Sequence, residues 1–322
     1  MERIAIMRSD SSVARTTVET GATAAASMQD MLDRVRREGA VHSVWDLAVE
    51  RISLGGMLLL RQEAELLAQL GGVRTLILHI AGEDIDARQR QLVECTWKSS
   101  YSVELRFERF CSPDYAWPSA AIGRSGFSYQ FFDRVALLAA ALRQRPPQLQ
   151  WPSEITKQAR DLISRYRGRV VAVHLKNVAD QGPEQSNANQ AAWAEFFARS
   201  ARPGALNFVL LGSDATHSSV TAVPGIERAV DLGVPLEIQL ALAGHADGFL
   251  GMASGICAAA VLSQSPYILF KHPTHHIDEM QRELGESEHF PFAGLHQQVW
   301  RRADTVDRLV RALAEISLSW AT

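Results

Sequence analysis

The most informative segment of the chain is Ala246-Asp-Gly-Phe-Leu-Gly-Met-Ala-Ser-Gly-Ile-Cys-Ala-Ala-Ala-Val261. Its apolar residues 248–251 predict a strand, the small residues 252–255 a turn, and the alanines that follow a helix. Because the first N–H groups of a helix have no partner inside it, a turn at this place favours an anion. Ser254 offers a hydroxyl and Gly255 permits close backbone approach, which suits a diphosphate. A tight connection that admits only small residues would explain the same pattern.

The composition is that of an ordinary globular protein, and the length allows two domains. The chain has 322 residues, of which 47% are hydrophobic and 21% are charged. The formal net charge of -3 provides no broad basic field for nucleic acid. No apolar run is long enough to span a membrane, and the N-terminus does not resemble a signal peptide. The odd set Cys95, Cys111 and Cys257 lacks metal-binding spacing and fits a reducing compartment, so we expect a cytoplasmic protein.

The first half of the chain contains one clear strand–helix–strand unit. Residues 41–45 predict a strand, and residues 57–69 predict a helix with leucines along one face. The helix is expected to end at Gly71-Gly72. Residues 73–80 form a nearly continuous apolar run, as a strand in a parallel sheet requires, because both of its faces are covered.

A proline-rich segment, residues 145–152, predicts a stiff linker between two domains, 1–150 and 151–322. Beyond it, strands are expected at 169–175, 206–211 and 267–270, and helices at 153–166, 190–199, 226–231, 236–245 and 303–316. Gln297 and Gln298 are expected in a loop before the last helix. Strands that alternate with helices predict a second parallel α/β domain.

Three segments, taken in order, resemble the ADP-heptose:lipopolysaccharide heptosyltransferase group. They are Ser53-Leu-Gly-Gly-Met-Leu-Leu-Leu60, the run 171–214 with its tryptophan-containing helix, and the segment 246–270. The resemblance implies the α/β GT-B fold, in which two Rossmann-like domains face an interdomain cleft. It also implies metal-independent transfer of a sugar from a nucleotide-diphosphate donor to a hydroxyl acceptor, with the donor held by the C-terminal domain and no cofactor.

One position departs from the family pattern. Where the family has an aspartate placed to act as base toward the acceptor, this chain has Gly56, and a glycine cannot move a proton. Asp46 and Glu50 precede the loop and are candidates for the missing base. Asp10 is a third candidate if residues 4–7 form the first strand of the sheet. The sequence does not choose among them.

Polar residues at predicted strand ends and helix starts are the candidates for donor binding. Lys176 and Lys271 would bring positive charge to the cleft, and Glu237 at a helix start could accept the ribose hydroxyls. Together the candidates are His174, Lys176, Asn177, Gly212, Ser213, Asp214, Glu237, Ser254, Gly255 and Lys271. Each has a plainer explanation as well: a solvated lysine, a buried histidine, a helix-capping acid or an ordinary turn.

Metal binding is not expected, because His275-His276 with Asp278 and Glu279 matches no standard zinc spacing. The predicted function is therefore a glycosyltransferase that binds a nucleotide-diphosphate sugar and a hydroxyl-bearing acceptor, and the chain could form a homodimer. Two alternatives stay open: a nucleotide-sugar hydrolase or epimerase on the same fold, and a non-catalytic nucleotide-sugar-binding protein that has lost its base at position 56.

Overall fold

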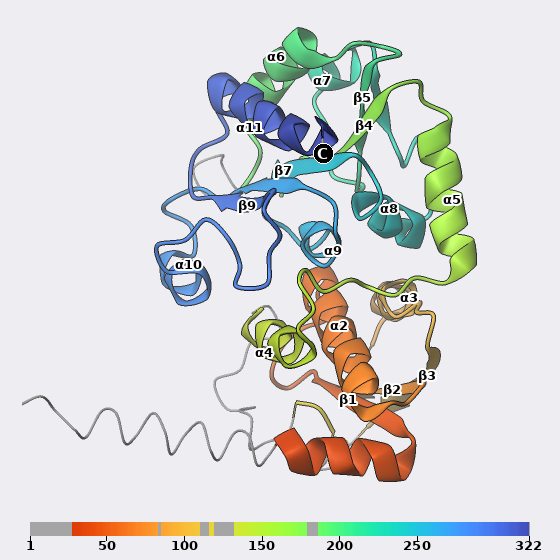
Figure 1. Cartoon of the computed structure of the whole chain (residues 1–322). Coiled ribbons are helices and arrows are strands. Elements are labelled where there is room, and N and C mark those ends of the chain that lie inside the picture. Colours follow the sequence, from red (N-terminus) through yellow and green to blue (C-terminus); the bar gives the residue numbers. More distant parts are fainter. Residues whose placement is uncertain (1–27, 83–84, 110–115, 119–131, 179–185, 322) are drawn as a thin grey trace, which may run out of the picture.

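Two parallel sheets, one in each half of the chain, organise the structure (Figure 1). The computed structural model describes residues 28–82, 85–109, 116–118, 132–178 and 186–321. The first half contains β1 (Ala40–Asp46), α2 (Leu54–Gly71), β2 (Thr75–Ala81), α3 (Ala87–Thr96), β3 (Ser102–Glu108) and α4 (Asp133–Leu142). Within these described ranges, no helix combines the length and apolar character needed to cross a bilayer.

The strands of the first half lie in the order β1-β2-β3, and both pairings are parallel. Apolar side chains of β1 and β2 are buried, as the continuous pattern of 73–80 predicts. Helix α2 begins at Leu54 because the Ser53 side chain accepts a hydrogen bond from the Gly56 N–H at 3.2 Å. It ends at Gly72, which is left-handed with φ 72°, so the predicted glycine stop is confirmed.

The second half carries a six-stranded sheet in the order β6-β5-β4-β7-β8-β9. Its strands are β4 (Arg169–His174), β5 (Leu206–Leu210), β6 (Ile226–Arg228), β7 (Gly248–Met252), β8 (Tyr267–Phe270) and β9 (Gln297–Trp300). All five pairings are parallel. The chain moves outward from β4 to β6 and then returns to place β7 on the other side of β4. The carboxyl ends of β4 and β7 therefore form a topological switch point, where open α/β sheets bind ligands.

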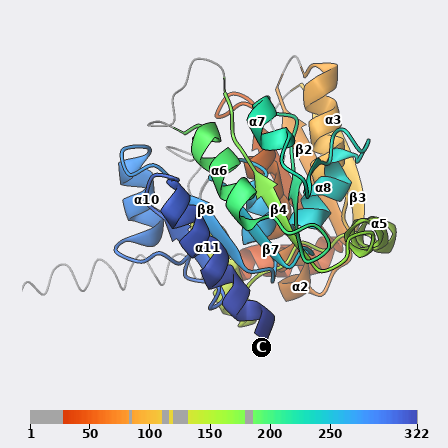
Figure 2. The same cartoon turned by 90° about the horizontal axis from the view of Figure 1, so that it is seen from above.

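Helices lie on both faces of this second sheet (Figures 1 and 2). The helices of the second half are α5 (Ser153–Ser164), α6 (Gln190–Ser200), α7 (Ser218–Thr221), α8 (Leu236–Ala243), α9 (Cys257–Val261), α10 (Ile277–Leu284) and α11 (Val306–Leu318). Val171 and Val173 of β4 pack into one apolar cluster with α6 and α11. Val170 and Ala172 face the opposite way, into the cluster that contains α8 and α9. This alternation is what a strand buried on both faces requires.

Two predicted elements are wrong. Residues 226–231 do not form a helix, because Ile226–Arg228 pairs with β5 as the short strand β6. Gln297 and Gln298 do not lie in a loop, because they open strand β9. The side chain of Gln297 is buried and donates to the carbonyl oxygens of Ser263 and Ser265, both at 2.9 Å. Because the polar side chain of Gln297 has its hydrogen-bond partners inside the protein, the strand can begin with polar residues, which in a sequence do not indicate a buried strand.

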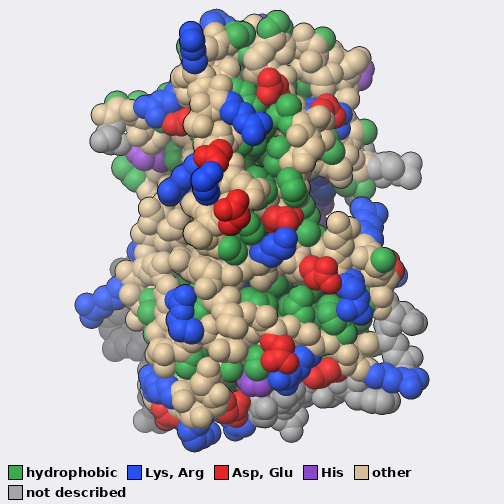
Figure 3. Space-filling view, turned by 90° about the vertical axis from the view of Figure 1, so that its right-hand side faces the viewer, with side chains coloured by type: hydrophobic (Ala, Val, Ile, Leu, Met, Phe, Trp, Pro, Cys, Tyr) green, Lys and Arg blue, Asp and Glu red, His purple; other side chains and the backbone are tan. Residues whose placement is uncertain are grey.

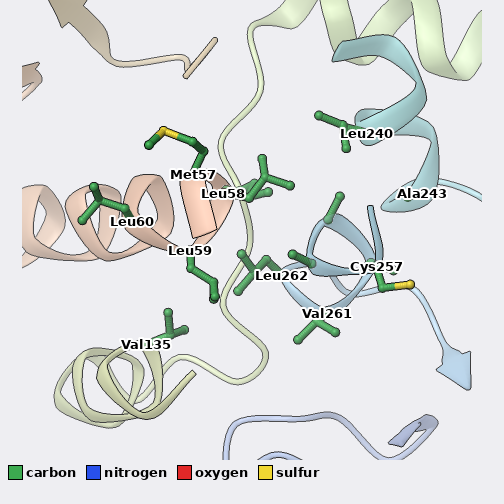
Figure 4. Close-up of a cluster of buried hydrophobic side chains, with 14 of the residues drawn as sticks. Met57, Leu58, Leu59, Leu60, Val135, Leu240, Ala243, Cys257, Val261 and Leu262 are labelled. Atoms are coloured by element: carbon green, nitrogen blue, oxygen red, sulfur yellow. The ribbon is translucent and has the colours of Figure 1, made fainter. Parts of the chain in front are cut away.

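The two halves share a continuous apolar core (Figure 4). Leu58 and Leu59 of α2 lie against Val261 and Leu262 at the end of α9, and all four are at most 2% exposed. Val135 of α4 completes the contact from the first half. Burial of apolar surface is the main favourable term in folding, so this contact holds the halves together.

Helix α2 also carries charged side chains that are fully buried. Arg61 donates to Glu65 at 2.8 Å, to the Thr96 carbonyl at 3.0 Å and to the Gln150 carbonyl at 2.9 Å. Glu65 in turn accepts the Gln150 N–H at 2.9 Å and the Ser99 hydroxyl at 2.6 Å. The segment between the halves is thus fastened to α2 at Gln150.

A second buried carboxylate on α2 fastens α4. Glu63 is fully buried, and Arg134 donates to it with Nε at 2.8 Å. The indole N–H of Trp117 donates to the same carboxylate at 2.6 Å.

On the face of the molecule shown in Figure 3, positively and negatively charged side chains are interspersed, with no broad patch of one sign.

Replacement of Arg61 by Met should lower the free energy of unfolding by about 3–5 kcal/mol, because the buried Glu65 carboxylate then lacks its cation. The measurement is urea unfolding followed by circular dichroism. Lys157→Met is the control, since Lys157 is exposed and pairs with Asp161 on the same helix. If both variants unfold at the same urea concentration as the unmodified protein, the network does not stabilise the fold.

Candidate functional site

A cavity of about 800 Å³ lies between the two halves, beside the carboxyl ends of β4, β7 and β8. Its size suits a small organic ligand. From the first half it is lined by the loop that leads into α2, by the start of α2 and by Phe132. From the second half it is lined by Lys176, the turn after β7, α9, the end of β8, α10, Phe290 and Val299.

Two glycines bring the halves into backbone contact at this cavity. A Cβ atom on Gly255 would lie 2.9 Å from the backbone nitrogen of Gly55, and one on Gly55 would lie 3.2 Å from the Gly255 Cα. Gly255 therefore makes its close contact with the first half of the chain, and its predicted contact with a diphosphate stays a prediction. The close contact sets the N-terminus of α2, an 18-residue helix with no acidic residue in its first turn, in the cavity wall. That helix end carries partial positive charge.

Lys176 and Lys271 supply full positive charge to the same cavity. Lys176 follows β4 and Lys271 follows β8, so parallel strands carry both to one edge of the sheet. Burial lowers the pKa of Lys176, and burial together with the Lys176 charge lowers the pKa of Lys271 to about 8. Within the part of the chain that the structure describes, neither ammonium group has a hydrogen bond or ion pair. Two unpaired cations that repel each other favour a bound anion.

Helix α10 and the two histidines just before it contribute titratable groups that the sequence analysis did not assign to a site. Glu283 lines the cavity and accepts the Phe132 N–H at 2.6 Å, and burial raises its pKa to about 7. His275 also lines the cavity, and burial and Lys271 lower its pKa to about 4. His276 lies 3.5 Å from Glu279. The apolar residues Ile277, Met280 and Leu284 recur at helical spacing and could have predicted this helix.

Three of the predicted donor-binding residues tie the loops after β4 and β5 to each other and do not line the cavity. The buried His174 donates from Nδ1 to the Leu211 carbonyl at 3.0 Å, and its Nε2 lies 3.7 Å from Asp214. Burial lowers the pKa of His174. The Asn177 N–H donates to the Asp214 carboxylate at 3.1 Å, and its side chain donates to the Ala215 carbonyl at 2.7 Å.

Gly212, Ser213 and Glu237 also lie outside the lining of the cavity. Gly212 has φ 89°, which favours glycine, and its N–H donates to Gln239 at 2.8 Å. Ser213 is exposed. Glu237 accepts a hydrogen bond from Lys98 of the first half at 2.5 Å. This carboxylate therefore joins the two halves, and its predicted contact with a ribose stays a prediction.

The candidate bases have different locations. Asp10 lies outside the described residues. Asp46 accepts the Ala48 N–H at 2.8 Å and does not line the cavity, whereas Glu50 does. Gly56 also lies in the cavity wall, but a Cβ atom there would be 2.5 Å from the Trp45 ring and 2.8 Å from the Ser53 hydroxyl. An aspartate therefore has no room at position 56.

Comparisons with known proteins bear on the fold. No family model matches the chain, and no curated protein matches it. Among solved structures, the glycosyl transferase family 9 protein from Veillonella parvula is similar with a TM-score of 0.50 and 10% identity, over 87% of this chain and 97% of that one. E. coli heptosyltransferase WaaC with ADP gives a TM-score of 0.47 and 13% identity, over 86% and 99%. The first likeness confirms the predicted GT-B fold with its two Rossmann-like halves.

Gly255→Ala should destabilise the protein by about 1–3 kcal/mol, because the added methyl group meets the Gly55 backbone and forces the halves apart. The measurement is the midpoint of thermal and urea unfolding. Gly294→Ala is the matched control, since a Cβ atom there would have its nearest neighbour at an ordinary 3.6 Å. Equal stability of the two variants would contradict close backbone contact between the halves at Gly55 and Gly255.

Proposed function

We propose that this protein is a glycosyltransferase that moves a sugar from a nucleotide-diphosphate donor to a hydroxyl acceptor. The observation that carries the proposal is a pair of lysines, Lys176 and Lys271, that have no ion pair among the described residues and lie in a cavity between two α/β halves at a topological switch point. The family-like order of the segments around Ser53, 171–214 and 246–270 supports the same conclusion.

The chemistry of sugar transfer explains why such a cavity needs positive charge. When the bond to the sugar breaks, negative charge develops on the diphosphate leaving group, and fixed cations and N–H groups stabilise it. In our proposal Lys176 and Lys271 supply that charge. The turn at Ser254 and Gly255 and the N-terminus of α2 supply backbone N–H groups. We propose that no metal ion is needed for this stabilisation.

Several predicted donor-binding residues lie outside the cavity, and their positions restrict how the donor can bind. Asn177, Gly212, Ser213, Asp214 and Glu237 do not line the cavity in the described structure. A donor that contacts them must extend from the lysines along the loops that follow β4 and β5. We propose that the diphosphate occupies the lysine end, with the nucleoside directed toward these loops.

Lys271→Met and Lys176→Met should each weaken the binding of ADP, UDP or GDP about 10- to 100-fold, because each removes a charge-assisted contact to phosphate. Isothermal calorimetry measures the affinities, after a thermal-shift screen has selected the nucleotide. Lys157→Met is the control, since Lys157 is exposed on α5. If no diphosphate nucleotide stabilises the protein, the proposal is wrong. Binding without release of nucleoside diphosphate from any nucleotide sugar would favour the non-catalytic alternative.

The affinity for the nucleoside diphosphate should also depend on pH in a defined direction. Lys271 is charged below its pKa of about 8 and loses the charge as the pH rises through that value. Affinity should therefore fall about tenfold from one unit below to one unit above this pKa. Calorimetry should also detect proton uptake on binding near pH 8, because a bound anion raises the pKa of the lysine. In Lys271→Met both effects should disappear, and their persistence would exclude Lys271 as their source.

A further inference from the structure

Glu283 occupies an unusual place between the two halves. It lies near the end of α10, and its Oε1 atom accepts the N–H of Phe132 at 2.6 Å. Phe132 is the residue that precedes α4, and its own side chain makes no capping hydrogen bond. Glu283 lines the cavity together with Phe132, Phe290 and Met280. Its second carboxylate oxygen has no hydrogen bond within the described ranges, so it is available to a molecule in the cavity.

The charges around Glu283 come from three elements. Asp133 of α4 and Arg282 of α10 pair with each other at 2.5 Å and are exposed. Lys271 after β8 is the cation of the cavity that acts on Glu283, and Glu279 lines the same cavity one helical turn away. Burial among apolar neighbours, together with the Asp133 charge, outweighs the Phe132 N–H and the cations Arg282 and Lys271, and it raises the pKa of Glu283 to about 7. A carboxyl group that titrates near neutral pH can take up and release a proton efficiently.

We propose that Glu283 is the general base that accepts the proton of the acceptor hydroxyl. As the O–H proton moves to the Glu283 carboxylate, the acceptor oxygen forms a bond to the anomeric carbon of the donor sugar. The bond from that carbon to the diphosphate oxygen breaks, and its electron pair leaves with the nucleoside diphosphate held by Lys176 and Lys271. This inference rests on the proposed function. It accounts for the absence of a carboxylate at Gly56, because the proton acceptor comes from the other half of the chain.

The test compares Glu283→Gln with the unmodified protein. The amide oxygen of glutamine still accepts the Phe132 N–H, so the variant removes the titratable group and keeps the contact with α4. The donors are UDP-glucose, ADP-glucose and GDP-mannose, the acceptors are water, glycerol and 2-phenylethanol, and the readout is release of nucleoside diphosphate. Glu286→Gln is the matched control, since Glu286 is exposed on the same segment and does not line the cavity.

We expect Glu283→Gln to lower kcat by about 10²- to 10⁴-fold. The KM for the donor and its calorimetric affinity should stay within about threefold, because only the proton transfer is lost. In the unmodified protein the rate should fall as the pH decreases through about 7, and this acidic limb should be absent in the variant. Glu286→Gln should behave like the unmodified protein.

Three results would overturn the inference in distinguishable ways. If the unmodified protein releases nucleoside diphosphate from no donor, the proposed function fails and the base fails with it. If the protein is active but Glu283→Gln retains its rate while Glu50→Gln loses it, Glu50 is the base and only this inference fails. If Glu283→Gln loses donor affinity and thermal stability in proportion to its rate and keeps the acidic limb, Glu283 is a helix-capping residue.

Discussion

The structure depends above all on the burial of α2 between the two halves. One side of this helix packs on the first sheet, and its Leu58 and Leu59 pack on Val261 and Leu262 of the second half. Because the same helix begins in the cavity wall, the contact that joins the halves also fixes the distance across the cavity. Arg61 and Glu65 add directional hydrogen bonds to this apolar contact. These bonds hold the segment that connects the two halves at Gln150.

Much of the fold could be predicted because most of its strands are apolar and end at glycine-rich or polar residues. The runs at 73–80, 169–175 and 206–211 correspond to β2, β4 and β5. The errors arise where tertiary contacts replace local pattern. Gln297 is stable in a buried strand only because two carbonyl groups of a distant loop accept its hydrogen bonds. Helix α3 buries only Val93 and Thr96, so its sequence has little of the apolar periodicity by which a helix is predicted.

The site residues that could be predicted from the sequence are those that directly follow the end of a strand. Lys176, Lys271, Ser254 and Gly255 all line the cavity, because parallel strands bring their carboxyl ends to one edge. Glu283 could not be placed from the sequence, since its importance comes from contact with Phe132, far away along the chain. The contact of Gly255 with Gly55 is likewise a property of the assembled halves.

The crowding around Gly56 has a consequence for protein engineering. The Trp45 ring that leaves no room for a side chain at position 56 also donates its indole N–H to the Glu50 carbonyl at 3.0 Å. An engineer who wished to install a carboxylate at position 56 would therefore have to shrink Trp45 in the same step. That change would remove the hydrogen bond that holds the segment carrying Glu50. A variant with a carboxylate at position 56 therefore needs substitutions at both Gly56 and Trp45, together with a redesigned loop between them.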